Sequence, residues 1–343
     1  MSELRQDPTT KDWAIISTER SKRPHQFAPD GQLEAEIPAF DEKCPFCPGN
    51  EAQTPPEIMR ISSTEGSDSA PWQVRVVPNK FSALSLGRGT ITRRLSGELF
   101  LSLDGMGVHE VIVETSRHNA RLCLMEVPEV ERLLSAYRSR YNALKTHPYI
   151  RFIIIFRNYG VRAGTSLEHP HSQLVGTPVA PPYIRRKFQV ATSYYDDMGR
   201  CLYCHVFRDE RDTGDRIVLE TDEFLVFHPF ASRYPFETWI APKKHCSSFG
   251  LITESQLSEL AWVLKRYLSK MHSLLKAPHY NLMVNTSPTE NEENPYYDWH
   301  IIIIPRLTMI AGFEIGTGIS INTALPEETA RFLRQSDTLV PIP

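Results

Sequence analysis

The residues best suited to chemistry lie close together in one stretch near the middle of the chain. From residue 158 to residue 173 the sequence reads Asn-Tyr-Gly-Val-Arg-Ala-Gly-Thr-Ser-Leu-Glu-His-Pro-His-Ser-Gln. Alternate side chains of an extended segment share a face, so His169, His171 and Gln173 are expected to point the same way. One imidazole of such a pair can bind a metal while the other attacks a substrate. The alternative is a pair of ordinary hydrogen-bonded histidines, which the crowding of polar groups around them disfavours.

A buried strand is predicted to position this stretch. Residues 152–156 read Phe-Ile-Ile-Ile-Phe, an apolar run typical of a strand covered on both faces. Gly160 and Gly164 follow it, and glycine lets the backbone approach a ligand closely. A helix over 128–145 is predicted before the strand, because apolar residues recur there at helical spacing. The reactive groups are therefore expected at the end of a rigid element.

Two Cys-x-x-Cys pairs, Cys44/Cys47 and Cys201/Cys204, account for four of the six cysteines. The first seven residues read Met-Ser-Glu-Leu-Arg-Gln-Asp and carry no apolar signal-peptide region. We therefore expect a cytoplasmic protein. In that compartment such pairs indicate metal binding or redox chemistry rather than disulfides.

The second half of the chain repeats the plan of the first. Each half presents, in order, a Cys-x-x-Cys pair, a strand, a histidine, a long helix, a strand ending in asparagine, and an x-x-His stretch. The second helix is predicted to start near Glu254, where Thr253 and Gln256 match a capping box. A constant offset within each segment is what a duplication followed by changes in loop length leaves behind. The offset is 157 residues between the cysteine pairs, 127 from His118 to His245 and from Asn158 to Asn285, and 129 from His169 to Asp298 and from His171 to His300.

The duplication also suggests the metal ligands, because equivalent positions should play equivalent roles. The first set is Cys44, Cys47, His118 and His169, a Cys₂His₂ combination that suits tetrahedral Zn²⁺. The second set is Cys201, Cys204, His245 and Asp298, in which a carboxylate completes a second zinc site. His300 is an alternative fourth ligand there, or else a core or substrate-facing histidine.

These patterns predict an α+β fold that is internally duplicated, with an open antiparallel sheet and one long helix per half. The N-terminal half is expected to span residues 1–180 and the C-terminal half residues 181–343. A net charge of −3 gives no electrostatic footprint for nucleic acid. No apolar run approaches the length of a membrane span, so neither nucleic acid nor membrane is expected as a partner.

The central stretch resembles the histidine-triad superfamily, and specifically its galactose-1-phosphate uridylyltransferase branch. Asn-x-Gly, Gly-x-Ser and His-Pro-His-x-Gln recur in that branch in the order found here at 158–160, 164–166 and 169–173. The similarity covers nearly the whole chain and extends to plant ADP-glucose phosphorylase. It implies a histidine-triad-like fold, a structural zinc at the first metal set, nucleotide-sugar and sugar-phosphate substrates, and a homodimer.

The same resemblance implies roles for individual residues. His171 is expected to be the nucleophile, with Gln173 and Ser166 as donors to the phosphate. Arg20 and Arg23 match family arginines on the nucleotide phosphates, and Asn79 matches an asparagine that touches the nucleotide. The remaining matches to family substrate contacts are Asn158, Gly164 and Thr165 in the central stretch, and Gly312, Phe313 and Glu314 in a segment that contacts the hexose.

The expected chemistry is transfer of a nucleotide through His171. A neutral imidazole with one free nitrogen can attack the α-phosphorus of a nucleoside diphosphate sugar, expel sugar 1-phosphate and leave a nucleotidyl-histidine. A second phosphate then accepts the nucleotide, which predicts ping-pong kinetics. No Walker loop is present, so the chain is not a P-loop kinase.

Three functions stay open at this stage. The leading hypothesis is exchange of UMP between UDP-glucose and galactose 1-phosphate, and the second is an ADP-glucose phosphorylase-like transfer of AMP to phosphate. The third is a zinc-stabilised nucleotide-binding module without catalysis. Two departures from well-known uridylyltransferases leave the substrate undecided, namely Lys80 in place of an acidic residue and Thr308 in place of a lysine.

Overall fold

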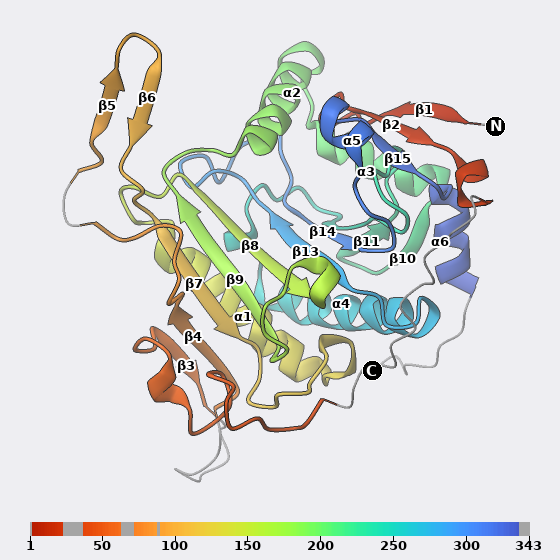
Figure 1. The fold of residues 1–343 in the computed structure, drawn as a ribbon. Coiled ribbons are helices and arrows are strands. Elements are labelled where there is room, and N and C mark those ends of the chain that lie inside the picture. Colours follow the sequence, from red (N-terminus) through yellow and green to blue (C-terminus); the bar gives the residue numbers. More distant parts are fainter. Residues whose placement is uncertain (1, 23–36, 63–71, 88–89, 336–343) are drawn as a thin grey trace.

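A ten-stranded antiparallel sheet runs through the whole molecule in this computed structural model, which describes residues 2–22, 37–62, 72–87 and 90–335 (Figure 1). From one edge to the other the strands are β10 (Ile217–Glu220), β11 (Phe224–Phe227), β12 (Thr238–Pro242), β14 (His300–Pro305), β13 (Tyr280–Asn285), β8 (Phe152–Tyr159), β9 (His171–Thr177), β7 (Val108–Val113), β4 (Val74–Pro78) and β3 (Met59–Ile61).

The remaining strands form two small sheets. β1 (Glu3–Gln6), β2 (Trp13–Ile16) and β15 (Ser320–Asn322) make one, while β5 (Arg93–Ser96) and β6 (Phe100–Leu103) make a hairpin that projects from the body (Figure 1). The helices are α1 (Val127–Leu144), α2 (Pro182–Met198), α3 (Leu202–Thr213), α4 (Glu254–Leu274), α5 (Gly312–Thr317) and α6 (Pro326–Gln335). Among the described residues no helix is both long and apolar enough to cross a bilayer.

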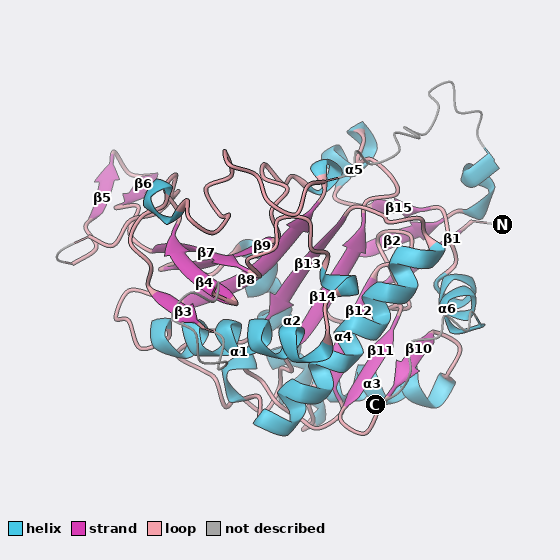
Figure 2. Cartoon of the chain, turned by 90° about the horizontal axis from the view of Figure 1, so that it is seen from below, coloured by secondary structure: helices cyan, strands magenta, loops and turns pink. Residues whose placement is uncertain are grey.

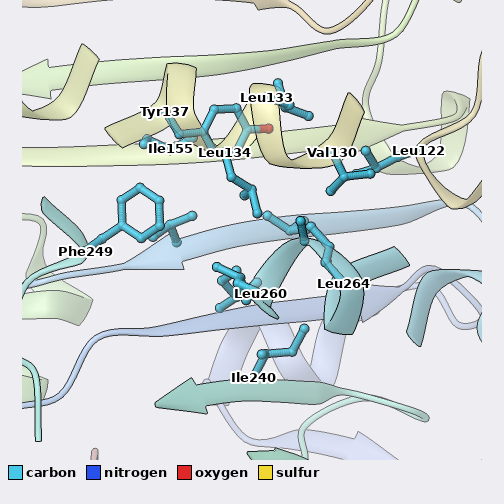
Figure 3. Packing of buried hydrophobic residues seen from close by; sticks show 14 of the residues in the cluster. Leu122, Val130, Leu133, Leu134, Tyr137, Ile155, Ile240, Phe249, Leu260 and Leu264 are labelled. Carbon is cyan, nitrogen blue, oxygen red and sulfur yellow. The ribbon is translucent and has the colours of Figure 1, made fainter. Parts of the chain in front are cut away.

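The two long helices α1 and α4 cover one face of the sheet (Figure 2). Their apolar positions recur every three or four residues, so each helix buries one stripe. Leu133 of α1 and Leu260 of α4 are fully buried in the resulting core, together with Ile155 and Ile240 of the sheet (Figure 3). Burying one such side chain stabilises the fold by roughly 1.5–3 kcal/mol. Thr253 and Gln256 form the expected capping box at the start of α4.

The opposite face of the sheet is covered differently in the two halves. In the second half α2 and α3 pack on it, and Ala191 and Phe207 join Trp239 and Ile302 in a second core. In the first half the same face meets the Cys44–Cys47 loop, which packs against Val111. The sequence patterns did not predict α2 and α3. Cys201 is the N-cap of α3, and Cys204 lies in its first turn.

The expected duplication is confirmed by the register of the sheet. Ile155 pairs with Leu174, and the residues 127 and 129 positions later, Leu282 and Ile303, are also partners. The two halves join where β8 pairs with β13. At the centre of this seam Phe156 lies opposite Met283, its own counterpart in the repeat, so the halves are related by a local two-fold arrangement. The duplicated α+β architecture with one open sheet is therefore correct.

Candidate functional site

His171 begins strand β9, and its ring is oriented by the backbone. The ring nitrogen Nδ1 lies 2.9 Å from the carbonyl oxygen of His169 and donates its proton to it, which leaves the lone pair on Nε2. The residue is 8% exposed, and burial lowers its pKa below the usual value. Phe46 lies against the ring with a centroid separation of 5.5 Å. His171 is thus held as a neutral imidazole with the lone pair of Nε2 fixed in direction.

Cys44, Cys47, His118 and His169 form a compact cluster with ligand atoms all within 4.8 Å of one another. Cys47 Sγ is 3.4 Å from His118 Nδ1 and 3.7 Å from His169 Nδ1. A tetrahedral zinc, with bonds of about 2.3 Å to sulfur and 2.0–2.1 Å to nitrogen, separates such atoms by about 3.6 Å. His169 Nε2 donates to the Thr115 carbonyl at 2.7 Å, which leaves Nδ1 free for a metal. The first predicted ligand set therefore has the donors and the spacing that zinc requires.

A second cluster joins Cys201, Cys204, His245 and Asp298, again with ligand atoms within 4.8 Å of one another. Cys204 Sγ lies 3.4 Å from His245 Nδ1 and 3.1 Å from Asp298 Oδ2. The cluster is more open than the first, because the Cys204 and His245 side chains are partly exposed. The predicted set is assembled here as well.

The alternative ligand His300 does not join this second cluster. Its Nδ1 donates to the Asp298 carbonyl at 3.0 Å, and its Nε2 lies 3.1 Å from Lys187 Nζ. The ring is fully buried and stacks on Trp239 with centroids 4.4 Å apart. Of the alternatives left open for His300, the structure supports a core histidine.

Three polar side chains, from the neighbouring strands β9 and β7 and from the residue after β4, form a row on the face of the sheet that carries His171. Gln173 Oε1 lies 2.7 Å from His109 Nε2, and the same nitrogen lies 3.0 Å from Asn79 Nδ2. His109 on β7 is a diagonal neighbour of Gln173 on β9, and Asn79 follows β4 directly opposite His109. The structure thus brings together Asn79 and Gln173, both of which are predicted substrate contacts, and adds His109 between them. The period-two alternation of β7 could have indicated that His109 shares their face.

The loop from β8 to β9 holds the other predicted residues of the central stretch. Asn158 lies on β8, and its Oδ1 accepts a hydrogen bond of 2.7 Å from Asn281 Nδ2. Gly164 has a φ of 88°, a left-handed conformation that favours glycine. Thr165 Oγ1 donates to the Leu167 carbonyl at 3.1 Å, and Ser166 is exposed. Their contacts with substrate stay predictions.

Gly160 was expected to let the backbone approach a ligand, but the structure gives another reason why this residue is glycine. Its φ is 80°, and a Cβ atom there would come within 2.1 Å of the His279 ring. Packing against this ring, together with the left-handed backbone, excludes a larger residue.

The residues predicted to contact the hexose and the nucleotide phosphates lie away from His171. Gly312, Phe313 and Glu314 form the first turn of α5, and Glu314 Oε2 accepts from the Ala311 backbone N–H at 3.2 Å. Arg20 lies in a 3-10 turn, Thr18–Lys22, that follows β2. Both segments are well separated from the start of β9 (Figure 1). Within one chain they are not brought to His171, and Arg23 lies outside the described residues.

A buried polar network supports β9 from the side of the helices. Ser172 Oγ donates to Glu114 Oε1 at 2.5 Å and also contacts the hydroxyl of Tyr137. Glu114 forms an ion pair with Arg157 at 2.8 Å, and Arg157 donates to Tyr280 at 2.9 Å. The sequence patterns gave no role to Glu114 and Arg157, since nothing in the sequence marks which buried strand positions carry paired charges. The network fixes the strand that carries His171.

Fold and site together define a class of protein, in which a duplicated α+β sheet presents a His-Pro-His-x-Gln strand end beside a Cys₂His₂ cluster. Comparison with known proteins makes this specific. The model of the galactose-1-phosphate uridyl transferase N-terminal domain matches residues 1–181, and that of the C-terminal domain matches residues 187–334. The chain belongs to this family, as the resemblance of the central stretch had implied.

Individual relatives fall on both branches considered above. The chain is 34% identical over 335 residues to an ADP-glucose phosphorylase of Arabidopsis thaliana, covering 97% of this chain and 92% of the relative. It is 30% identical over 345 residues to a galactose-1-phosphate uridylyltransferase of Thermotoga maritima, covering 98% and 99%. A crystal structure of the Arabidopsis thaliana phosphorylase with bound ADP-glucose superimposes with a TM-score of 0.83 at 32% identity, covering 99% of this chain and 100% of that one.

Proposed function

We propose that this protein is a nucleotidyltransferase that moves a nucleotide from a nucleotide sugar to an acceptor phosphate through His171. The observation that carries the proposal is an oriented imidazole beside an amide. Gln173 lies two residues beyond His171 on the same face of β9, and His171 donates Nδ1–H to the His169 carbonyl in a hydrogen bond of 2.9 Å. It fixes the tautomer and directs the lone pair of Nε2 away from the backbone, as nucleophilic attack on phosphorus requires.

The reaction consists of two displacements at the same phosphorus atom. His171 Nε2 first forms a bond to the α-phosphorus while the bond to the sugar 1-phosphate oxygen breaks, and the sugar 1-phosphate leaves with the electron pair. An oxygen of the acceptor phosphate then attacks the nucleotidyl-histidine, and the bond between phosphorus and Nε2 breaks to restore the neutral imidazole. Each step transfers the nucleotide intact.

Protein groups support the charge that develops on the phosphorus oxygens. Gln173 is proposed to donate its amide to an α-phosphate oxygen, with Ser166 as a further donor on the adjoining loop. Zinc held by Cys44, Cys47, His118 and His169 would have all four positions filled by protein, so its contribution is to fix the loop that leads to His171.

For the substrates, we propose UDP-glucose as donor and galactose 1-phosphate as acceptor, the reaction named for the family. The second candidate, transfer of AMP from ADP-glucose to phosphate, is favoured by the similarity to the Arabidopsis thaliana phosphorylase. Thr308, where well-known uridylyltransferases carry lysine, also fits the second candidate.

We further propose that the enzyme is a cytoplasmic homodimer with halves divided near residue 180. The separation of α5 and of Arg20 from the start of β9 supports a dimer, because a second copy could bring these groups to the site (Figure 1). The gap between the end of β9 at Thr177 and the start of α2 at Pro182 supports the division. Light scattering that gives the mass of one chain would contradict the dimer.

Intact mass spectrometry tests the proposed chemistry directly. The protein is incubated separately with UDP-glucose and with ADP-glucose, and His171→Ala is the control. A UMP adduct absent from the variant supports the uridylyltransferase, whereas an AMP adduct alone moves the assignment to the phosphorylase. Turnover is then measured with galactose 1-phosphate and with inorganic phosphate, and absence of an adduct and of turnover with both donors overturns the proposal.

A further inference from the structure

We infer that His109 is a positioning residue that sets the direction of the Gln173 side-chain amide. The inference rests on the proposed function, because Gln173 is assigned there as the donor to the α-phosphate. An amide can turn over and present either its carbonyl oxygen or its NH₂ group to a ligand. Only the NH₂ group can donate to a phosphate, so the site needs something that holds the carbonyl on the opposite side.

The strands place His109 where it can do this. Gln173 Oε1 lies 2.7 Å from His109 Nε2, a normal length for a hydrogen bond from a ring N–H to a carbonyl. His109 opposes Val175 across the β7–β9 pair, which makes Gln173 its diagonal neighbour on the same face. Both side chains therefore extend from a paired region of the sheet, and the contact does not depend on a loop.

The surroundings of His109 identify which of its nitrogens carries the proton. Nδ1 is buried and has no hydrogen-bond partner in the described part of the chain, so a proton there would be an unsatisfied donor. It would also leave the Nε2 lone pair facing the oxygen of Gln173, and two acceptors at that distance repel each other. A proton on Nε2 removes the repulsion from Gln173 Oε1 and leaves Nδ1 as an unpaired acceptor instead of an unpaired donor. Nε2–H then donates to Gln173 Oε1.

Asn79 is affected by the same proton. Its Oδ1 accepts from the Phe81 backbone N–H at 2.9 Å, so its Nδ2 faces His109 Nε2 at 3.0 Å. One ring nitrogen offers a single in-plane site, and with its proton committed to Gln173 it cannot accept from Asn79. The 3.0 Å contact with Asn79 Nδ2 is then between two donors, a cost that the shorter hydrogen bond to Gln173 must outweigh. The Asn79 amide is then left with hydrogens to donate to a nucleotide. A single proton on His109 thus turns the Gln173 NH₂ group toward a ligand and leaves the Asn79 NH₂ group without an acceptor on His109.

The test compares His109→Phe, which removes the donor, with His109→Gln, whose terminal amide can replace it. We expect His109→Phe to slow formation of the nucleotidyl-histidine by about 10- to 100-fold, with the dissociation constant for the nucleotide sugar changed far less. His109→Gln should recover most of this rate. In a Gln173→Ala background, His109→Phe should have little further effect, because the group it positions is gone. His147→Phe, after the end of α1, is the matched control.

Two outcomes would overturn the inference. One is a His109→Phe rate equal to that of the unchanged protein, and the other is an undiminished loss in the Gln173→Ala background. Nitrogen-15 NMR of the ring provides a readout that does not need activity: the Nε2–H tautomer is expected, and Gln173→Leu should shift its N–H resonance. A ring protonated on Nδ1 would contradict the inference. A protein that forms no adduct but shows the expected NMR signals would instead count against the proposed function alone.

Discussion

His171 and His300 occupy equivalent positions in the two halves of the chain, yet the side chains that face their Nε2 atoms differ. Each begins a strand and donates Nδ1–H to the carbonyl two residues earlier, at 2.9 and 3.0 Å. Gln173, two residues beyond His171, is matched by the apolar Ile302 beyond His300. The hydrogen bond that orients the ring is therefore present in both halves, whereas the amide side chain beside the ring is present only in the first half.

Helix α2 accounts for the loss of access in the second half. Its Lys187 is fully buried and its Nζ lies 3.1 Å from His300 Nε2, so it fills the space in front of the ring. Among the described residues of the first half no helix takes the corresponding place, and the face of the sheet meets the Cys44–Cys47 loop there. An oriented imidazole is therefore not a nucleophile by itself, because it also needs an unobstructed nitrogen and donors for the phosphate.

The largest expected difference between the halves is catalytic. We predict that His171→Asn lowers kcat by at least about a thousandfold, because it removes the group that bonds to phosphorus. His300→Asn should leave kcat within about threefold of the unchanged protein. Steady-state kinetics with the preferred donor measures both, with circular dichroism to verify folding. Equal losses in the two variants would mean that the second half also takes part in the chemistry.

The buried Lys187 in the second half is expected to make the stability of the protein depend on pH. Burial lowers its pKa to about 7, whereas an unfolded lysine titrates near ~10.4. Between these values the unfolded chain binds more protons, so this group makes stability rise with pH, and below both values its effect is constant. We predict that the unfolding free energy of the unchanged protein, minus that of Lys187→Met, rises by on the order of 4 kcal/mol from neutral pH to pH ~10. Urea titrations measure it, and parallel pH curves would contradict it.

The two metal clusters should differ in their connection to activity. Cys44→Ser is predicted to remove one zinc per chain and lower kcat by about 10- to 100-fold, since His169 precedes His171 by two residues and would lose its anchor. Cys201→Ser should also remove one zinc but keep kcat within about threefold, with a lower melting temperature. Metal analysis by mass spectrometry together with kinetics tests this. A catalytic loss in Cys201→Ser as large as in Cys44→Ser would rule out the distinction.

The smallest effect is expected behind β9. Ser172 contacts the Tyr137 hydroxyl, whereas the equivalent residue in the second half is the apolar Ile301. Tyr137→Phe should lower the unfolding free energy by about 1 kcal/mol and reduce kcat less than about threefold, because Glu114 still holds Ser172. Denaturant unfolding and kinetics measure the two quantities. An unchanged stability would show that this hydrogen bond does not support the strand.

Much of this arrangement could be predicted from the sequence, because local patterns and the repeat carry it. The helical spacing over 128–145 predicted α1 nearly to its ends, and the apolar run at 152–156 predicted most of β8. The constant offsets between the halves grouped eight candidate metal ligands into two sets of four. In the structure the side chains of each set lie close together. A pattern that occurs twice constrains an interpretation far more than one that occurs once.

The rest depends on contacts between distant parts of the chain, which no local pattern encodes. A lysine on an amphipathic helix is normally exposed, and only the packing of α2 against β12 and β14 shows that Lys187 is buried. Glu314 and Arg20 match family motifs, but a motif does not state whether its residues reach the same site within one chain. His109 lies in the run Val-His-Glu-Val-Ile-Val at 108–113, which is typical of a strand, but its contact with Gln173 depends on the register of β7 against β9.

The seam between β8 and β13 has a consequence for how such a chain could arise. β8 alone would be an eight-residue edge strand with an apolar beginning, and an unpaired strand of this kind associates readily with another. Because Phe156 pairs with its own counterpart Met283, a single half could satisfy that edge by pairing with an identical copy of itself. The present chain has the arrangement that fusion of two such identical subunits would produce, and in a fused chain only one of the two equivalent histidines has to stay open to a ligand.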